Sequence, residues 1–583
     1  MQISRLRTAL GLTLVPAAVL LLAAAQAPAP AAKSAASAPA ALPMPAGAER
    51  AARAITRGSL EAPIRYLADD LLEGRGPASR GDELARLYLQ TTLELLGFQP
   101  GGPNGAWQQP FEIVGVAATL PETWDFKAGG ESVALKRSEE YMAASGVQNE
   151  KAAIDNAPLV FVGYGIQAPE YQWDDFKGAD VRGKVLVMLN NDPDWDPKLF
   201  GGKGRLYYGR WTYKYESAAR QGAAGAIIIH TTPSAGYPWQ VVQTSWNGEK
   251  FDLPADPGQP QIQVKGWTTE PAMRRLLQAA GQDLDQLVAQ ARSRDFKPVP
   301  LGLTTSLALS NKINRVKTAN VAGLLPGSDP KLKDEVVIYT AHHDHLGIGK
   351  PDAAGDRIYN GALDNATGDA QLLAIAKAFA ALPERPRRSV LILFVACEEQ
   401  NLLGSRQYAE HPTFPPGKIA ANINYDGGNV LGRTSDLTSI GFGKTSIDRI
   451  IQTLAARQGR TVEADQFPDR GFFYRSDQFN FAKIGVPALY LKSGTHYRGH
   501  DQEWGKAQAN DYETHRYHQP SDQFDPKWTY DGMIEDAQVG FYAGLTIAHN
   551  PILPVWNRGD EFEAARLKAL AAVSNGTEGR AGR

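Results

Sequence analysis

Histidine and carboxylate side chains gather at several points in the C-terminal half of the sequence. The densest group is AHHDHLG at 341–347, where a β-like run ends in three histidines and an aspartate. Successive side chains of an extended chain alternate between two faces, so His342 and Asp344 share a face while His343 points to the other. A ligand imidazole usually donates its second N–H to a carboxylate, a carbonyl or water, and Asp344 is placed to receive it. The pattern indicates a metal ligand at His342, with a solvated histidine-rich loop as the alternative.

Two adjacent carboxylates, Glu398 and Glu399, follow the very apolar run 390–396 with only Cys397 between. Burying two acids there without partners would cost free energy. Adjacent side chains point in different directions, so Glu399 can bind a cation while Glu398 faces the water to be activated. A metal hydrolase needs this division, because the cation lowers the pKa of water and a nearby carboxylate takes its proton. A charged strand end without chemistry is the alternative.

Three more residues are ordinary when each is considered alone. Asp364 lies in NGALDNATG (360–368) before an amphipathic helix, where helix N-capping is the usual role of an aspartate. Asp426 closes a strand-like run in NINYDGGN, and His518 lies in the loop RYHQPSD. The full set, with Asp364 shared, gives each of two cations one histidine and one further carboxylate, and mixed N and O donors without cysteine suit a catalytic Zn²⁺ site. The candidate metal ligands are His342, Asp364, Glu399, Asp426 and His518.

Strand and helix patterns alternate around these residues. Apolar strand-like runs at 336–344 and 389–399 flank a helical pattern at about 366–381. Apolar strands that alternate with helices imply a mostly parallel sheet with both faces covered, and chemistry in such sheets belongs at the carboxyl ends of the strands. The predicted fold class is therefore α/β, with a mostly parallel central sheet flanked by helices.

The residues above carry a resemblance to a known family. The sequence is similar to bacterial di-zinc aminopeptidases, which belong with the glutamate carboxypeptidases and the transferrin receptor; the resemblance is strong over 320–550 and weak over 51–120. It implies a zinc exopeptidase fold of the phosphorylase/hydrolase-like type and two Zn²⁺ ions per chain. Leu363 departs from the pattern, since many members carry a second acid there, and Cys397 stands where other small residues are commoner. Neither departure removes a ligand.

The resemblance also implies a role for each matching residue. Asp344 completes the family's H-x-D pattern, Glu398 matches the general base, and the five candidate ligands match the metal-binding residues. In some aminopeptidases of the group an Arg at the position of Arg475 contacts the substrate, and a Tyr just before the last histidine ligand, here Tyr517, stabilises the oxyanion. The alternatives are that Arg475 only pairs with Asp477 and that Tyr517 only packs. The predicted catalytic residues are Glu398, Asp344 and Tyr517, and the predicted substrate-binding residue is Arg475.

The N-terminus has the order of a secretory signal. Two arginines precede a mostly apolar run at 9–25 and small residues at 25–27, which predicts a signal peptide over 1–27, with an uncleaved membrane anchor as the alternative. The Ala, Pro and Ser composition of 28–50 is typical of a flexible linker. With a single cysteine, Cys397, an exported chain has no internal disulfide. We expect an exported protein, periplasmic or extracellular, without stable membrane insertion after signal removal.

A helical pattern begins at about Ala51 and ends before Gly97. Residues 125–305 differ, with short strand-like runs separated by Gly, Pro, Asp and Trp turns. Their segments 159–166, 183–190 and 215–230 resemble the protease-associated domain that is inserted in many exported peptidases; an accessory folding unit without a ligand is the alternative. The residues that recur at helical spacing are Leu84, Leu87, Tyr88 and Leu95. The predicted divisions are the signal peptide and linker, an N-terminal part of the peptidase domain at 51–124, an inserted β-rich unit at 125–305, the catalytic domain at 306–560 and a tail at 561–583.

Composition narrows the function. Hydrophobic residues make up 43% and charged residues 21% of the chain, as in ordinary globular proteins, and the formal net charge is −2 with no basic block, so nucleic acid is not an expected partner. We predict a zinc-dependent exopeptidase that hydrolyses the N-terminal peptide bond of short peptides, with Glu398 as general base. A carboxypeptidase or dipeptidase of the same superfamily, glutaminyl cyclisation, and a non-catalytic metal-stabilised peptide-binding protein are the alternatives.

Overall fold

The computed structural model of the chain describes residues 44–581, with side chains as far as Ser574. The predicted signal peptide and nearly all of the predicted linker lie outside the described residues. The described residues fall in one compact unit. Across 44–581, no helix combines the length and the apolar character that crossing a membrane requires.

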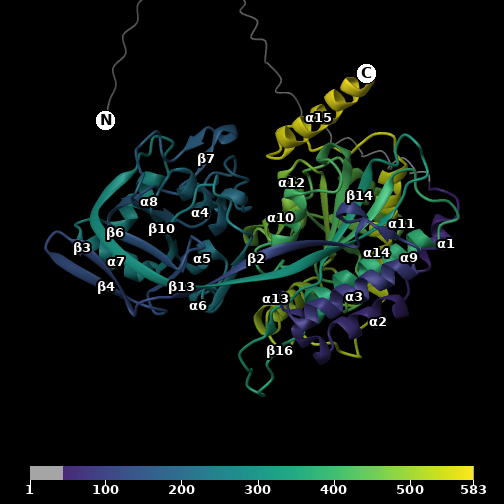
Figure 1. The fold of residues 1–583 in the computed structure, drawn as a ribbon, viewed down its shortest axis with the longest axis horizontal. Coiled ribbons are helices and arrows are strands. Elements are labelled where there is room, and N and C mark those ends of the chain that lie inside the picture. Colours follow the sequence, from purple (N-terminus) through teal and green to yellow (C-terminus); the bar gives the residue numbers. More distant parts are fainter. Residues whose placement is uncertain (1–43, 582–583) are drawn as a thin grey trace, which may run out of the picture. The chain divides into compact units, whose positions relative to one another are not determined.

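Four parallel strands form the middle of the sheet that carries the candidate site (Figure 1). In spatial order they are β17 (Ser389–Val395), β14 (Val336–His342), β18 (Ile419–Tyr425) and β21 (Ala488–Ser493). Antiparallel strands border them, with β13 (Val299–Leu325) beside β17 and β19 (Asp436–Ile440) beside β21. The prediction of an α/β fold with a mostly parallel central sheet is confirmed.

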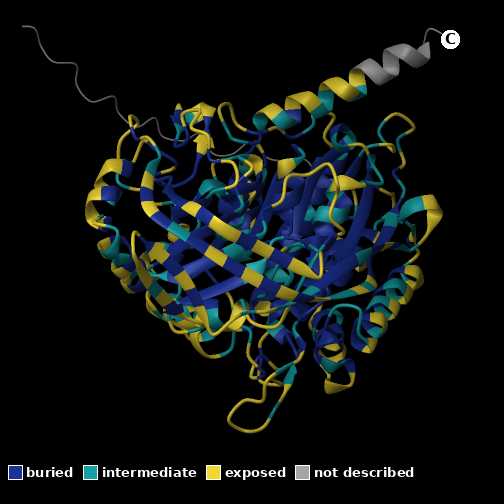
Figure 2. Cartoon of the chain, turned by 60° about the vertical axis from the view of Figure 1, so that its left-hand side comes forward, coloured by how far each residue is buried: buried dark blue, intermediate teal, exposed yellow. Residues whose placement is uncertain are grey.

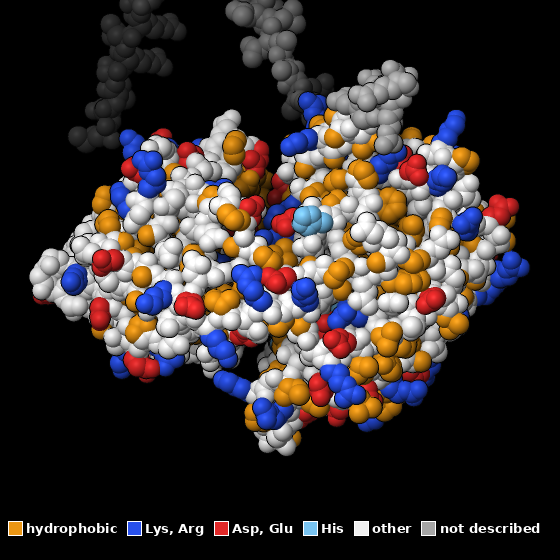
Figure 3. Space-filling view, viewed as in Figure 1, with side chains coloured by type: hydrophobic (Ala, Val, Ile, Leu, Met, Phe, Trp, Pro, Cys, Tyr) orange, Lys and Arg blue, Asp and Glu red, His pale blue; other side chains and the backbone are white. Residues whose placement is uncertain are grey.

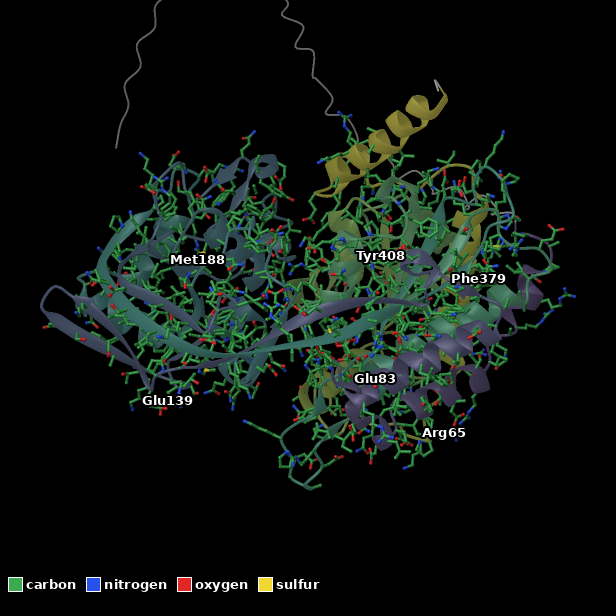
Figure 4. All side chains as sticks on the ribbon, viewed as in Figure 1. Arg65, Glu83, Glu139, Met188, Phe379 and Tyr408 are labelled. Carbon is green, nitrogen blue, oxygen red and sulfur yellow. The ribbon has the colours of Figure 1, made fainter. Side chains whose placement is uncertain are left out.

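Side chains of β14 alternate between two apolar cores. Val337 and Tyr339 lie in one core with Phe379, while Ile338 lies in the other with Tyr408. Figure 4 labels Phe379 and Tyr408, one from each core. Both faces of the sheet are therefore covered, which explains why its strands read as continuous apolar runs. The helices that supply the two cores include α9 (Thr367–Ala380) and α14 (Asp531–His549) on one face, and α10 (Leu403–Glu410) and α12 (Gln478–Lys483) on the other.

Helix α3 (Arg80–Leu95) forms where the sequence predicts a helix, but its buried stripe differs from the predicted spacing. Leu87 and Leu95 are 55% and 86% exposed. Helical spacing alone cannot show which of two neighbouring stripes meets the sheet, and here the packing partner is β13, where Leu93 lies against Gly323. The buried apolar residues of α3 are Ala85, Leu89 and Leu93.

The segment predicted to be β-rich has cores of its own. The patterns at 183–190 and 215–230 correspond to β9 (Val185–Leu189), α4 (Trp211–Arg220) and β10 (Gly225–His230). The pattern at 159–166 is only partly a strand, because β6 (Lys151–Phe161) ends at Phe161 and the chain turns at Gly163 and Gly165, both with positive φ. Strand β12 (Val264–Thr269) lies parallel to β10, so β9, β10 and β12 form a second group of parallel strands within the same large sheet.

Strand β13 spans 27 residues and pairs with strands of both regions. Its first part pairs with β6 and β3 (Thr123–Ala128), and its second part pairs with β2 (Gln108–Thr119) and β17. Much of its first half alternates buried and exposed residues, and long striped strands of this kind are visible in Figure 2. The predicted domain boundary at residue 305 falls inside this strand, so the division at 125–305 stays a prediction.

Charged side chains of both signs are interspersed on the face shown in Figure 3. Figure 4 labels three charged residues, and all three are exposed: Arg65, Glu83 and Glu139.

Candidate metal centre

Three parallel strands bring predicted site residues to one edge of the sheet. His342 is the last residue of β14, Glu398 and Glu399 follow the end of β17, and Asp426 directly follows β18. Carboxyl ends of parallel strands meet at the same edge, so stretches that are far apart in the sequence become neighbours there. This edge is where the sequence predicts the chemistry.

Asp364 lies between two histidines that come from different parts of the chain. Its Oδ1 is 3.2 Å from His342 Nε2, and its Oδ2 is 3.3 Å from His518 Nε2. Asp364 belongs to the turn Ala362–Ala366 before α9, and His518 follows α13 (Trp504–His515). One carboxylate oxygen directed at each imidazole is the arrangement expected of a ligand shared by two cations.

The other carboxylates divide between the two histidines. Asp426 Oδ1 lies 3.6 Å and Glu398 Oε2 lies 3.9 Å from His342 Nε2. Glu399 Oε2 lies 2.9 Å from His518 Nε2. Each histidine therefore has a carboxylate of its own besides the shared one, and Glu398 is close to the His342 side as well.

The donor atoms fit a metal ion. Buried atoms without a hydrogen-bond partner include His342 Nε2, His518 Nε2 and Glu399 Oε1. Leaving such atoms unpaired costs free energy that a bound cation would remove, and nitrogen and oxygen donors without thiolate suit Zn²⁺ in a catalytic site. Two overlapping groups, each with donor atoms within 4.8 Å of one another, are His342 with Glu398 and Asp426, and His342 with Asp364 and Glu399.

Burial and like charges perturb the acid–base behaviour of the site. Burial raises the pKa of Glu398 well above its ordinary value, and the carboxylates of Asp426 and Glu399 act in the same direction. Burial acts to lower the pKa of His518, but Glu399 and Asp364 outweigh it and raise that pKa to about 10. A carboxyl whose pKa is raised in this way is suited to taking up a proton and giving it back.

Asp344 supports the site in two ways. His342 Nδ1 lies 3.2 Å from the Asp344 carbonyl and 3.8 Å from its Oδ1, so the backbone oxygen is the nearer partner. The Asp344 carboxylate accepts hydrogen bonds from the backbone N–H groups of Glu398 (3.0 Å) and Glu399 (3.4 Å). The residue predicted to orient His342 does contact it, but its side chain mainly holds the two glutamates.

His343 faces away from the cluster, as the strand alternation predicts. Its Nε2 lies 3.0 Å from Asp82 Oδ1, and both side chains are fully buried. Arg86 and Thr318 donate to the same carboxylate at 3.1 and 2.9 Å. This buried contact ties α3 to the end of β14.

Arg75 is a fully buried cation next to the loops that carry the site residues. Its guanidinium donates to the carbonyls of His343 (2.7 Å), Asn360 (2.7 Å) and Gly361 (3.0 Å). These carbonyls belong to the two loops that carry His342 and Asp364. Arg75 therefore joins the two loops, and its charge lies near an acidic cluster.

His345 is a member of the cluster that the sequence analysis did not single out. It is fully buried, and its Nδ1 lies 2.7 Å from Glu399 Oε1. Its ring meets the His518 ring edge-on at 5.7 Å. The motif at 341–347 contained the signal, but strand alternation could not place His345, because β14 ends at His342.

Helix capping does not explain Asp364. The N-cap position of α9 is Ala366, which has no capping side chain. Asn365 Oδ1 instead accepts the backbone N–H groups of Gly368 (3.0 Å) and Gly427 (2.8 Å). The carboxylate of Asp364 is left free to face the two histidines.

Tyr517 and Arg475 lie together beside His518. The Tyr517 ring stacks on the His518 ring with centroids 3.8 Å apart, and its hydroxyl accepts a hydrogen bond from Arg475 Nη2 at 3.4 Å. Among the side chains that the structure describes, Arg475 forms no ion pair with Asp477.

A cavity of about 250 Å³ lies beside the cluster. Asp364, Glu398 and Asp426 line one part of it, and Arg475 and Tyr517 line it too. Its apolar lining includes Val430, Leu431, Ile440, Phe467 and Phe472. An apolar cavity with a few convergent polar groups is typical of a small-molecule or peptide-binding site.

Parts of the chain are similar to known proteins. Residues 320–541 match Peptidase family M28. Aminopeptidase NAALADL1 of Rattus norvegicus is 29% identical over 391 residues, which is 58% of this chain and 47% of the relative. A vacuolar membrane protease of Coccidioides posadasii is 30% identical over 134 residues, 22% of this chain and 12% of that protein. The chain thus spans about half or less of the length of the curated relatives it matches.

The chain also matches two solved structures, an aminopeptidase from Aneurinibacillus sp. strain AM-1 and BSAP, a zinc aminopeptidase from Bacillus subtilis. The first has a TM-score of 0.47 at 18% identity and covers 86% of this chain and 95% of its own. The second has a TM-score of 0.36 at 16% identity and covers 87% and 95%. The match at 320–541 includes every candidate metal ligand as well as Glu398. Over residues 320–541, the chain is similar to Peptidase family M28.

Proposed function

We propose that the chain is a metallo-aminopeptidase that binds two Zn²⁺ ions and hydrolyses the N-terminal peptide bond of short peptides. The observation that carries the proposal is the position of Asp364, with one oxygen 3.2 Å from His342 Nε2 and the other 3.3 Å from His518 Nε2. Such a carboxylate can serve two cations at once, which is the core of a two-metal hydrolase. The family and the relatives' names, aminopeptidase among them, support the assignment.

The distances between the histidine nitrogens and the carboxylate oxygens indicate how the predicted ligands would divide between the two ions. His342 and Asp426 would serve one, His518 and Glu399 the other, and Asp364 both. Zinc supplies a Lewis acid that polarises the scissile carbonyl and makes water a better nucleophile at neutral pH. The donor set leaves Glu398 free for a separate task.

Glu398 would take the proton from the attacking water and return it to the leaving amine. It lines the cavity, and its pKa is raised by burial and by the neighbouring carboxylates of Asp426 and Glu399. The hydroxyl of Tyr517 would donate a hydrogen bond to the substrate oxygen that becomes negative in the transition state. Arg475 lies within 3.4 Å of that hydroxyl, so its charge would favour the same role.

The substrate's amino terminus would be read by the acidic part of the cavity. Glu398 and Asp426 are the carboxylates available to receive an ammonium group. An acetylated peptide would leave them facing a neutral amide, which costs roughly 1–3 kcal/mol. We therefore expect N-acetylation to lower kcat/KM at least about tenfold.

The experiment compares Leu-Gly-Gly with its N-acetyl and C-amide forms on the zinc-loaded enzyme. The proposal expects cleavage of the free and C-amidated peptides and little cleavage of the acetylated one. Glu398→Gln protein prepared in the same way controls for contaminating peptidases. Equal cleavage of the free and acetylated peptides, with loss on amidation, would contradict the aminopeptidase assignment.

A carboxypeptidase or dipeptidase is the second candidate, because Arg475 and Lys492 are among the basic side chains that line the same cavity. Arg475 Cζ lies 5.3 Å and Lys492 Nζ lies 4.6 Å from the centre of the Phe472 ring. Within the described part of the chain neither cation is in an ion pair, so both could receive a substrate carboxylate. The peptide comparison above separates this candidate from the first.

Residues 125–305 are proposed to be a protease-associated-like unit that borders the cavity. Backbone N–H of Arg205 donates to the Pro468 carbonyl at 3.0 Å, and the Tyr207 ring lies 4.8 Å from the Phe479 ring. The loop that begins at Pro468 supplies several cavity residues, so contacts there can influence selectivity. Export to the periplasm or beyond is proposed from the N-terminal pattern alone, and N-terminal sequencing of the secreted or periplasmic protein tests it.

A further inference from the structure

Asp522 is a buried carboxylate close to the cluster that none of the roles above uses. Its side chain is 2% exposed. Oδ1 accepts the backbone N–H of Leu363 at 2.9 Å, and Oδ2 accepts both the backbone N–H of Asp364 at 3.1 Å and the hydroxyl of Tyr512 at 3.1 Å. The Asp522 carbonyl also accepts the N–H of Ala362 at 3.0 Å. One residue thus receives hydrogen bonds from three successive backbone N–H groups of the loop that holds Asp364.

These contacts join the loop of Asp364 to the loop of His518. Asp522 lies four residues after His518, and the backbone N–H of Asp522 donates to the Gln519 carbonyl at 3.1 Å, which closes a turn between them. Asp364 and His518 are both candidate ligands of the same cation. The relative position of these two ligands therefore depends on the hydrogen bonds that Asp522 accepts.

Tyr512 extends the connection to the cavity. It belongs to α13 and lines the cavity, and its hydroxyl donates to the oxygen of Asp522 that also holds the Asp364 N–H. A carboxylate that accepts backbone N–H groups forms short, charge-assisted hydrogen bonds with a strong directional preference. Such bonds fix the peptide plane next to Asp364 and so fix the direction in which its side chain leaves the backbone.

We propose that Asp522 is a positioning residue that holds the Asp364 loop against the His518 loop and thereby sets the spacing of the metal centre. The inference rests on the proposed two-metal site and deepens it, since it names what keeps the shared ligand in place. Partners of metal ligands commonly change metal affinity by about 10–100-fold when they are mutated. Metal retention, rather than turnover, is therefore the measurement that reports on this role.

The test compares the full-length zinc-loaded wild type with Asp522→Asn, Tyr512→Phe and Asp525→Asn. Zinc release to a colorimetric chelator gives the rate and the amount of metal lost, and near-UV circular dichroism checks the fold. Asp522→Asn keeps the shape of the side chain but turns one acceptor into a donor that faces a backbone N–H. Asp525→Asn makes the same chemical change three residues away on an exposed side chain.

We expect folded Asp522→Asn to release zinc at least about tenfold faster than the wild type. Tyr512→Phe removes the hydroxyl that donates to Asp522, and we expect it to accelerate zinc release about threefold. We expect the zinc release rate of Asp525→Asn to stay within about twofold of the wild-type rate. Wild-type zinc retention by folded Asp522→Asn overturns the proposal. Should Asp522→Asn fail to fold, Tyr512→Phe decides, because a wild-type release rate in that variant also overturns it.

The outcome is separable from that of the proposed function. A wild type that holds two zinc ions without cleaving Leu-Gly-Gly contradicts the aminopeptidase, while faster zinc loss from Asp522→Asn still supports the positioning role. A wild type that binds no zinc contradicts both. Among variants that retain zinc, a loss in kcat without a matching rise in KM would indicate that the Asp364 geometry, rather than peptide binding, has changed.

Discussion

Glu398 and Glu399 are neighbours in the chain, but their carboxylates have different surroundings. Glu399 Oε2 lies 2.9 Å from His518 Nε2 and its Oε1 lies 2.7 Å from His345 Nδ1, so each oxygen lies close to an imidazole nitrogen. Glu398 Oε2 lies 3.9 Å from His342 Nε2 and faces the cavity. The difference follows from the end of β17, after which the chain turns and the two side chains diverge.

At this scale we predict that Glu398→Gln retains both metal ions and lowers kcat by roughly 10²–10⁴-fold, because only the proton acceptor is removed. Zinc per chain by elemental analysis, together with kcat on an aminoacyl p-nitroanilide, checks this. Glu399→Gln is the matched variant, and it should lose metal as well as rate. Loss of zinc from Glu398→Gln would mean that the roles of the two glutamates are exchanged.

Among the elements, α3 is held to the strand end of β14 by the buried contact between Asp82 and His343. Both side chains are fully buried, and the carboxylate also accepts hydrogen bonds from Arg86, Thr318 and the backbone N–H of Ala78. Asp82 also forms a largely buried ion pair with Arg86 at 3.1 Å, and removing one partner of a buried ion pair leaves the other without compensation. The contact joins helix and strand directly behind His342.

We therefore predict that Asp82→Ala lowers the free energy of unfolding by about 3–5 kcal/mol. Urea unfolding followed by circular dichroism measures the change. Glu83→Gln, at the exposed neighbour labelled in Figure 4, is the control and should change the free energy by less than about 0.5 kcal/mol. Equal effects of the two variants would show that the contact contributes little.

A second prediction at the scale of elements concerns the contact between Tyr207 and α12. The Tyr207 ring lies 4.8 Å from Phe479 and 6.3 Å from Tyr474, next to the loop that supplies Arg475. Tyr207→Ala should lower kcat/KM for tripeptides by roughly 3–10-fold with unchanged zinc content, because small displacements of substrate-contacting groups are costly. Tyr66→Ala, which removes a ring stacked on Tyr88 instead, is the control. Unchanged peptide kinetics in Tyr207→Ala would argue against an influence of this segment on selectivity.

For the whole molecule, the metal centre links stability to metal and to pH. In the metal-free protein, burial acts to lower the pKa of His518. The carboxylates of Glu399 and Asp364 outweigh burial and raise that pKa from 6.5 to about 10. A folded-state pKa above the unfolded value stabilises the protein below pH 6.5, and this stabilisation is lost as the pH rises through 10. A bound cation needs the unprotonated imidazole, so its contribution grows over the same interval.

The predicted outcome is a gap in Tm between zinc-loaded and metal-free protein that widens as the pH rises from about 6.5 toward 10. At a free zinc concentration of 1,000 times Kd, one site adds about 4 kcal/mol. Differential scanning calorimetry of protein treated with a chelator, and of the same protein with zinc restored, measures the gap. Comparing the two forms at each pH cancels the contribution that titrating groups elsewhere make to stability. Lys214 is such a group, since burial lowers its pKa to about 7. A gap that narrows over this interval would contradict the linkage to His518.

The sequence by itself indicated the fold class and the residues that are candidate metal ligands. Strands β14, β17 and β18 are covered on both faces, so their apolar runs are long enough to identify, and donor residues lie at or within a few residues of their ends. Local periodicity carries this information because it reflects the burial of nearby positions along one element. Local periodicity also separated His343 from the cluster. His343 directly follows β14, and its backbone N–H still donates to Val395 of β17, so the alternation of the strand extends to it.

Only the tertiary structure decided which groups meet across long sequence separations. Asp522 and Asp364 are 158 positions apart, and His343 and Asp82 are 261 positions apart. Periodicity also left open which stripe of α3 is buried, and strand alternation could not place His345 beyond the end of β14. Such contacts depend on how elements pack and where the chain turns between them, and neither is encoded in the spacing of residues within a single element.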